Sequence, residues 1–482
     1  MSIISKFILI LRRTVALVLL PLLACSCQLV VDDYDCETDI SDARQYINVT
    51  ISISASETPA TRANPNGGEN GDGQEKGIDT RENEVDGVTL IFFQDPANTT
   101  AGINATVANA EATTIDCAVY YTVTRDDSHA SAHPTGHTDE VFYTTGDREL
   151  DLTLDPSNTY HLLVVANADL TGNITVGTTT LAQLRDMTLS SVYNTGTGIG
   201  TTASKFVMSS EKDHTIDFSS SIYDATTNRL TFNLDNVHME RMAARIDFST
   251  EYGSYDVTLG GYKYYMGDNG DVFVLTKVTP FNLYNENEFV FKRVQDTWSG
   301  TPTTTYLGDE TMTSNKADNY VVDPKTHLKD NDLTSHPFSL LSPIAASMND
   351  EYSHSMTTAQ SSPIIICYMK ENTLMPTSHL KKYATGIAFE GKYYTGSIGA
   401  TPENRTYYHY LRHQGESDDS YLAKQWGDLS DTEISTADTP MNIGIVRNNI
   451  YRISIKGGGQ GTLKIKIEET KWRHVDNPII YL

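Results

Sequence analysis

The stretch YINVTISISASETPATRANPNGGENGDGQEKG (residues 46–77) begins like a β-strand and continues like a linker. Apolar residues occupy every second position of its first part, the period of a strand that buries one face. These residues are Ile47, Val49, Ile51 and Ile53. The second part is rich in Gly, Asn and Glu, a composition typical of accessible linkers, and Arg62 stands between the two parts. The stretch therefore predicts a first strand that is tied to the protein by a segment open to proteolysis.

Alternating or β-branched runs of the same kind recur along the chain, and clusters of Asn, Gly, Asp and Pro separate them. They occupy residues 85–93, 119–124, 160–168, 229–234, 362–369, 450–457 and 462–469. Helical periodicity is scarce and is best over residues 180–187, where Leu181 and Leu184 share a face. Strands without intervening helices predict antiparallel sheets, so we expect an all-β fold of β-sandwiches with short helices and long loops.

The 482 residues are enough for two antiparallel β-sandwich domains in tandem. We place the boundary after residue 248, which assigns residues 63–248 to an N-terminal domain and residues 249–482 to a C-terminal domain. A polar stretch over residues 297–336 is expected to be a loop of the second domain.

The charge of the chain is strongly acidic, with 36 Lys and Arg residues against 62 Asp and Glu residues and a net charge of −26. This balance leaves no basic surface to neutralise phosphates, so a nucleic-acid partner is excluded. The same charge favours solubility outside the cell.

The first 24 residues form a signal peptide by composition. Their charged residues are Lys6, Arg12 and Arg13, and residues 14–24 are a mostly apolar run. Such a run is too short to span a bilayer alone and is typical of the apolar part of a secretory signal.

The signal ends in LLACSC (residues 22–27), which has the form of a lipobox. Cys25 follows Leu22 and Ala24 at the expected positions, and Cys27 is the alternative lipid site. A diacylated cysteine would anchor the chain to a membrane by its N-terminus.

No catalytic or metal-binding motif stands out. His129, His133 and His137 recur at intervals of four. Pro134 and Gly136 break any helix there, so a solvated loop is expected. The sequence GDNGD (residues 267–271) reads as a turn, since it lacks the remainder of a calcium-binding loop. Cys117 and Cys367 are expected to be buried small hydrophobes. We therefore expect neither an enzyme nor a cofactor.

Ten segments, taken in chain order, resemble the fimbrillins, the lipoprotein-precursor pilins of the type V pili of Gram-negative Bacteroidota. They are the lipobox cysteine, TRA (61–63), VTLIFF (88–93), LLVVANA (162–168) with TLAQLRDM (180–187), KFVMSSE (205–211), MAARIDF (242–248), CYMKENT (367–373), KYYTG (392–396), VRNNIYRISIKGGG (446–459) and a last strand with Trp472. The resemblance implies transthyretin-like sandwiches and a structural subunit of an adhesive surface fimbrium.

The resemblance also implies that residues 25–62 are a propeptide whose first strand is removable. An Arg-specific protease of the outer membrane would cut between Arg62 and Ala63, with Lys76 and Arg81 as competing sites. The first strand would then leave its groove, and a C-terminal strand of the next fimbrial subunit would replace it by β-augmentation. The expected partners are thus other fimbrial subunits, the protease and, before maturation, the outer membrane.

The donor segment is expected at the C-terminus. Residues 462–472 alternate and are expected to pair within their own domain. Residues 475–482 are expected to be donated, because an apolar terminus on an acidic secreted protein needs a partner. Their apolar residues are Val475, Ile479, Ile480 and Tyr481.

Two alternatives remain open. The sequence CQLVVDDYDC (residues 27–36) resembles the start of the related anchor and accessory subunits, which leaves open a stalk, anchor, accessory or tip position. The other alternative is a surface glycan-binding lipoprotein, for which Tyr407, Tyr408 and Tyr410 would form an exposed aromatic platform. On a strand, such aromatic residues more often form core and cross-strand pairs.

Overall fold

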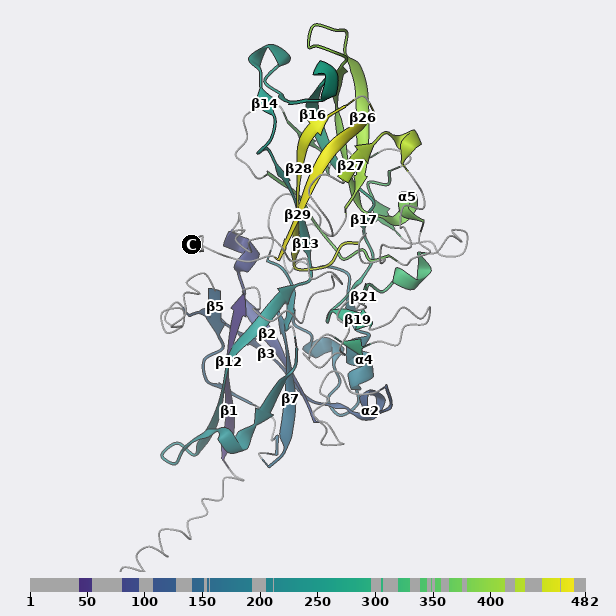
Figure 1. Cartoon of the computed structure of the whole chain (residues 1–482). Helices are drawn as coiled ribbons and strands as arrows, with labels where there is room; N and C mark the ends of the chain where they lie inside the picture. The colour runs from purple at the N-terminus through teal and green to yellow at the C-terminus, as the bar shows by residue number, and fades with distance from the viewer. Residues whose placement is uncertain are drawn as a thin grey trace, which may run out of the picture.

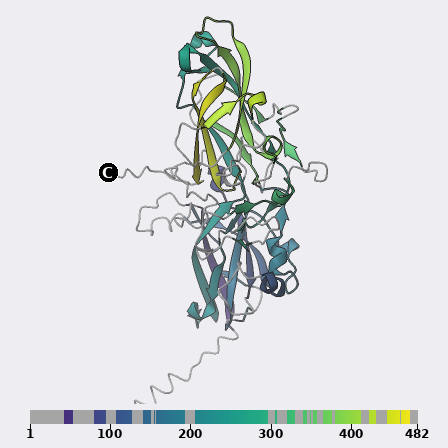
Figure 2. The same ribbon diagram turned by 45° about the vertical axis from the view of Figure 1, so that its right-hand side comes forward.

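The structure is a computed structural model, and two stacked β-rich lobes make up the part of the chain that it describes (Figure 1). The lobes keep this arrangement in the turned view (Figure 2). The described residues are 43–53, 80–94, 107–126, 141–150, 154–155, 157–192, 205–210, 212–295, 305–306, 320–329, 339–344, 348, 352–356, 364–374, 379–411, 421–429, 444–459 and 461–471. The predicted all-β fold is confirmed.

The first sheet has eleven strands and forms the lower lobe of Figure 1. Its main path runs β3-β2-β7-β9-β12-β1-β5-β4. The strands are β1 (Arg44–Ile53), β2 (Gly87–Phe93), β3 (Ile115–Thr122), β4 (Thr124–Arg125), β5 (Val141–Thr144), β6 (Arg148–Glu149), β7 (Thr159–Ala166), β9 (Met208–Ser210), β10 (His214–Asp217), β11 (Ile222–Asp224) and β12 (Arg229–Arg241). The long strand β12 joins the two halves of this sheet, because its beginning pairs with β1 and its end with β9.

The second sheet also has eleven strands and follows the path β14-β15-β16-β25-β26-β27-β29-β28-β13-β24. Its strands are β13 (Ala244–Ser249), β14 (Ser254–Tyr255), β15 (Lys263–Met266), β16 (Val272–Phe281), β23 (His354–Ser355), β24 (Ile364–Met369), β25 (Gly386–Tyr394), β26 (Glu403–Tyr410), β27 (Tyr421–Lys424), β28 (Asn449–Gly458) and β29 (Thr462–Lys471). The pairing of β29 with β28 confirms the prediction that residues 462–471 belong to their own domain.

Three small sheets and several short helices complete the described fold. The small sheets pair β17 (Leu283–Tyr284) with β22 (Leu340–Leu341), β18 (Glu288–Phe289) with β8 (Thr188–Leu189), and β19 (Arg293–Gln295) with β20 (Thr305–Tyr306) and β21 (Tyr320–Val322). The helices are η3 (Thr80–Asn83), α2 (Val107–Ala112), η5 (Thr171–Asn173), α4 (Leu181–Arg185), η6 (Phe218–Ser220), η7 (Val257–Leu259), η8 (Asp268–Gly270), η10 (Thr326–Leu328), α5 (Leu380–Tyr383) and η12 (Trp426–Asp428). Among the described residues, no helix is long and apolar enough to cross a membrane.

Local sequence explains the one predicted helix, α4. Thr180 caps its N-terminus and forms a capping box with Gln183, which satisfies two backbone donors. Leu181 and Leu184 are buried on one face, as predicted. The prediction that residues 297–336 are entirely loop is wrong, because β20, β21 and η10 lie within that stretch.

The pairing of two strands differs from the antiparallel expectation. Most neighbouring strands are antiparallel, but β1 is parallel to β12 and β13 is parallel to β28. In each sheet, the strand that comes first in the chain therefore lies beside one of the last strands that the chain adds to that sheet. Parallel neighbours need a long crossover, and a long run of chain supplies it in each case.

The chain passes from the first sheet to the second between Arg241, the last residue of β12, and Ala244, the first of β13. The sequence-based domain boundary after residue 248 lies one strand later. Most of one apolar core lies in the first sheet and a second core in the second sheet. Cys117 and Cys367 are free and buried in these cores, as predicted.

Candidate functional site

The first strand, β1, lies inside its sheet between β12 and β5. Along one edge it pairs in parallel with β12, from Arg44 opposite Arg229 to Ser52 opposite His238. Along the other edge it pairs antiparallel with β6 near its beginning and with β5 near its end. Without β1, the two walls of this groove would present unpaired backbone groups on both sides.

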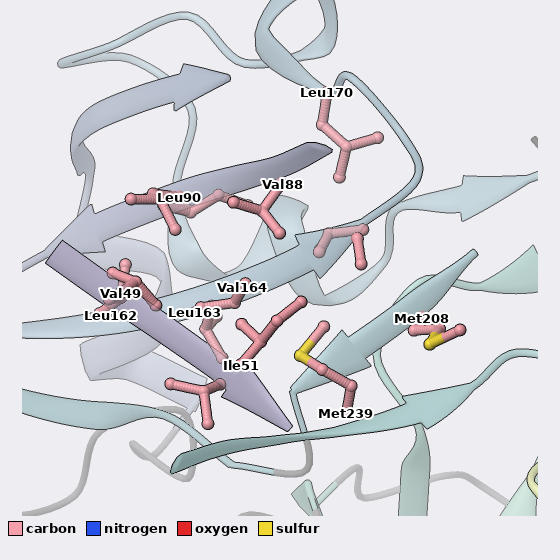
Figure 3. Close-up of a cluster of buried hydrophobic side chains, with 14 of the residues drawn as sticks. Val49, Ile51, Val88, Leu90, Leu162, Leu163, Val164, Leu170, Met208 and Met239 are labelled. Atoms are coloured by element: carbon pink, nitrogen blue, oxygen red, sulfur yellow. The ribbon is translucent and has the colours of Figure 1, made fainter. Parts of the chain in front are cut away.

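The apolar face of β1 fills the core of the first sheet. Its four predicted inward residues are completely buried: Ile47, Val49, Ile51 and Ile53. Figure 3 shows Val49 and Ile51 among core side chains of β2, β7 and β12, including Val164 and Met239. At roughly 1.5–3 kcal/mol for each buried side chain, the four contribute about 6–12 kcal/mol.

The opposite face of β1 carries neutral side chains. The Asn48 side chain accepts a hydrogen bond from Thr144 Oγ1 at 2.8 Å, and Ser52 Oγ lies 3.0 Å from His238 Nδ1. The one charged residue of β1, Arg44, is exposed. Withdrawing β1 would therefore leave no buried charge without its partner, which keeps the electrostatic cost of removal low.

An aromatic contact marks the beginning of the groove. The Arg229 guanidinium lies 3.7 Å from the centre of the Tyr46 ring, and Tyr46 Oη donates a hydrogen bond of 3.1 Å to Glu149. Arg229 also pairs with Asp147 at 3.0 Å. These partly exposed contacts hold the beginning of β1 against β12 and β6.

The first strand of the second sheet, β13, differs in one respect that matters for exchange. Its Arg245 and Asp247 are fully buried and joined by two hydrogen bonds of 2.8 Å. Arg452 of β28 lies 3.5 Å from the same Asp247 carboxylate. Arg245 and Asp247 lie on the same strand and would leave together, but withdrawing β13 would take Arg245 away from the buried Glu82 of η3, at about 3–5 kcal/mol for such a broken pair.

A buried polar network lies where the two sheets meet, and the helix η3 supplies its centre. Glu82 accepts hydrogen bonds of 2.9 and 3.0 Å from Arg245 and a further one from Tyr368. Its backbone carbonyl accepts a bond of 3.0 Å from Arg241 Nε. Burial opposes the charge of Arg245, but attraction to Asp247 and Glu82 outweighs it and raises the Arg245 pKa.

A second buried network lies near the first. Arg447 donates to Glu371 at 2.9 Å and lies 3.5 Å from Glu288, and all three side chains are fully buried. Lys292 pairs with Glu240 of β12 at 2.6 Å. Together these contacts join strands of the first sheet to segments of the second half of the chain.

Several predicted site residues lie outside the described residues. They are the lipid sites Cys25 and Cys27, the cleavage residues Arg62, Ala63 and Lys76, the donor residues Val475, Ile479, Ile480 and Tyr481, and the histidines 129, 133 and 137. The structure thus brings together the four inward residues of the removable strand and does not test the other sites.

Of the remaining sequence candidates, GDNGD forms a turn around η8, as predicted. The carboxylate of Asp271 accepts hydrogen bonds from Tyr393 and from Gly396 N. Within the described part of the chain, no group of His, Cys, Asp or Glu side chains is placed to hold a metal ion.

The aromatic platform of the glycan-binding alternative does not form as drawn from the sequence. Tyr407 and Tyr410 are buried in the apolar cores of the second half of the chain. Tyr408 is half-buried and its ring packs edge-on against Trp426 at 5.7 Å. Two of the three rings are therefore core residues, as strand aromatics usually are.

No family model and no curated protein matches this chain. Solved structures do match it, and three of them illustrate the set. One is a C-terminally truncated form of the tip fimbrial protein Mfa3 of Porphyromonas gingivalis, with 10% identity and a TM-score of 0.38 over 89% of this chain and 100% of that one. The structural neighbours of this chain are fimbrial proteins.

The other two have the same character. A fimbrilin (FimA) of Porphyromonas gingivalis has 13% identity and a TM-score of 0.40, over 91% of this chain and 100% of that one. A fimbrial assembly protein of Parabacteroides distasonis has 10% identity and a TM-score of 0.34, over 86% of this chain and 92% of that one. At these values the likeness is a broad one, and function has to be argued from the chain's own strands.

Proposed function

We propose that this chain is a structural subunit of an adhesive surface fimbrium, and that β1 is the strand exchanged during its assembly. The observation that carries the proposal is the position of β1. It lies between two strands of its sheet, buries four apolar side chains, and precedes a Gly- and Asn-rich linker with an arginine at its start.

The proposed maturation begins with export as a lipoprotein. Cys25, or alternatively Cys27, receives the lipid that holds the precursor at the outer membrane. An Arg-specific protease then cuts between Arg62 and Ala63, whereas the competing cut after Lys76 would need a protease that accepts lysine. A cut after Arg81 is disfavoured, because the next residue, Glu82, is buried in the network between the two sheets.

The proposed polymerisation is a replacement of one strand by another. When β1 leaves, β12 on one side and β5 with β6 on the other lack their partner, and apolar pockets open at alternate positions. A segment of the next subunit restores both the hydrogen bonds and the apolar contacts. The proposed donor is residues 475–482, with Val475, Ile479, Ile480 and Tyr481 as its apolar residues.

The chemistry of the two first strands supports the choice of β1. Both β1 and β13 lie in parallel beside a later strand. The face of β1 opposite the core is neutral, whereas β13 carries the buried Arg245–Asp247 pair. A strand without buried charge is the easier one to replace. The subunit is proposed to be non-enzymatic, to need no cofactor and to bind no nucleic acid.

The alternative is that the chain is an anchor or accessory subunit of the fibre. The sequence CQLVVDDYDC (residues 27–36) favours this alternative, because it resembles the start of such subunits. In that case the chain keeps its lipid and β1 stays in place. The same fold would then serve at an end of the fibre.

The test is the N-terminal residue of the protein recovered from surface fibres. A mature N-terminus at Ala63 is the expected result, and one at Gly77 keeps the mechanism and moves the cut. Lipidated full-length protein within fibres would overturn the stalk assignment and leave the anchor or accessory position. Absence of the chain from any surface fibre would overturn the proposed function.

A further inference from the structure

The far wall of the β1 groove has an unusual connection to the rest of its sheet. Within the described residues, β5 pairs with β1 and with the two-residue strand β4, and β6 pairs with β1. We call β4, β5 and β6 the arm. The ladder between the arm and β12 therefore runs through β1, so an empty groove would lack backbone bonds between its two walls.

One side chain holds the end of the arm that lies near the second sheet. Tyr143 of β5 is buried, pairs with Ile51 of β1, and donates a hydrogen bond of 2.9 Å from its hydroxyl to the Asn83 carbonyl. Burial raises the pKa of Tyr143, which keeps the phenol protonated as a donor.

The acceptor of this bond is itself anchored independently of β1. The Asn83 side chain accepts a hydrogen bond from Arg241 of β12, and the adjacent Glu82 is bound by Arg245 of β13. Tyr143 thus connects the arm to β12 through η3, across the groove rather than through the strand that fills it.

The other end of the arm is held by further contacts that do not involve β1, among them the 3.0 Å pair between Arg229 of β12 and Asp147 of the turn between β5 and β6. Tyr121 Oη donates a bond of 2.6 Å to the Glu149 carbonyl of β6. Arg148 donates a bond of 3.2 Å to the Thr122 carbonyl at the end of β3. These contacts are more exposed than that of Tyr143, so solvent competes with them more strongly.

We propose that Tyr143, through its bond to the Asn83 carbonyl, is a positioning residue that holds the arm in place while the groove is empty. This inference rests on the proposed strand exchange. In the precursor, the hydrogen bond of Tyr143 adds little to the position of the arm, because β1 already connects the arm to β12. In the emptied subunit it keeps the two walls at the spacing of an absent strand, so that the incoming strand meets a preformed site.

The test uses the full chain after cleavage in the linker by an Arg-specific protease and release of β1 in denaturant. The probe is a fluorescent synthetic peptide with the sequence of residues 44–54, and the measurement is its association rate with the emptied protein. Tyr143→Phe keeps the ring and removes the hydroxyl. The matched control is Tyr160→Phe on β7, whose buried hydroxyl accepts a 2.9 Å bond from Asp155 N away from the groove.

We expect Tyr143→Phe to slow association by about threefold to tenfold, the effect of one lost hydrogen bond. It should leave the thermal midpoint of the uncleaved chain within a few degrees of wild type, and amides of β5 should exchange faster only in the emptied form. Tyr160→Phe should leave the association rate unchanged.

Two results would overturn the inference while strand exchange stands. One is an unchanged association rate for Tyr143→Phe when wild type binds the peptide. The other is an equal loss in Tyr160→Phe, which would mean a general loss of stability. Failure of the wild-type protein to bind the peptide at all would instead overturn strand exchange, and this inference with it.

Discussion

Arg245 and Glu82 form an ion pair of 2.9 Å in which neither side chain is exposed, although 163 positions separate them in the chain. Glu82 belongs to η3, which follows the linker, and Arg245 belongs to the first strand of the second sheet. The pair therefore fastens the segment after the linker to the second sheet. Cleavage and loss of β1 would leave this attachment unchanged.

We expect Glu82→Ala to lower the free energy of unfolding by about 3 kcal/mol, the lower end of the range for a broken buried pair. Asp247 still contacts Arg245 and limits the loss. Urea denaturation of the uncleaved chain is the measurement. The control is Glu84→Ala, whose partly exposed carboxylate lies 3.4 Å from Lys205 and should matter by less than about 1 kcal/mol. Equal losses in both variants would contradict the assignment.

A second prediction separates the precursor from the fibre. Ile51→Ala should lower the stability of the uncleaved chain by about 2–5 kcal/mol, because it opens a cavity in the core. Assembled fibres should keep wild-type stability, since the proposed exchange removes β1 from them. Leu163→Ala on β7 is the control and should weaken both forms. Fibres weakened by Ile51→Ala would show that β1 remains in place.

A third prediction concerns the donor. Deleting residues 475–482, or replacing Ile479 and Ile480 with Asp, should abolish SDS-resistant oligomers after Arg-specific cleavage. A carboxylate in an apolar groove costs several kcal/mol, and the deletion removes the donor altogether. The thermal midpoint of the uncleaved monomer should stay within a few degrees of wild type. A large fall in that midpoint would assign the segment to its own domain. SDS-resistant oligomers that persist in these variants would place the donor elsewhere.

A fourth prediction concerns export. If Cys25 is the lipid site, as proposed, Cys25→Ala should abolish fatty-acid labelling and leave unprocessed precursor, because the lipobox peptidase and the lipid would both lose their cysteine. Metabolic labelling of cells that express each variant is the measurement. Continued labelling of Cys25→Ala, with loss in Cys27→Ala, would move the lipid site to Cys27 and strengthen the anchor assignment.

A fifth prediction concerns pH. Burial, with repulsion from Lys212 second, lowers the pKa of His214 on β10 from 6.5 to about 4. The unfolded chain therefore binds this proton at a higher pH than the folded one. The stability that the neutral ring preserves is complete above pH 6.5 and is lost as the pH falls towards 4.

His214→Gln removes this titration, so the variant should lose less stability than wild type between pH 7 and about pH 4.5. Urea midpoints at the two pH values are the measurement. Parallel losses in the two proteins would show that His214 is not buried as a neutral ring.

Local patterns in the sequence were sufficient for the inward face of β1 and for several other strands, such as β2, β7 and β28, whereas the long strands β16 and β25 were not predicted. The alternation of Ile47, Val49, Ile51 and Ile53 predicts that these side chains share a buried face, and all four are completely buried. The cap at Thr180 likewise marks where α4 begins. These features depend on neighbours within a few residues, so a single sequence contains them.

The parallel pairing of β1 with β12 and the network around Glu82 could not be predicted in the same way. Both depend on segments far apart in the chain. In MAARIDF (residues 242–248), Arg245 and Asp247 look like the solvated face of a strand, yet both are fully buried. Their charge is tolerated because each finds a partner that only the folded chain brings near.

The continuity of β12 with β13 has a mechanical consequence for a fibre under tension. A strand held in the groove lies along β12, so a pull along the fibre would slide the two strands lengthwise and load many backbone hydrogen bonds together. The same pull passes through two residues into β13, which lies between β28 and β24, one strand from the edge of the second sheet. In the proposed fibre, force would therefore travel from subunit to subunit through strands loaded in shear.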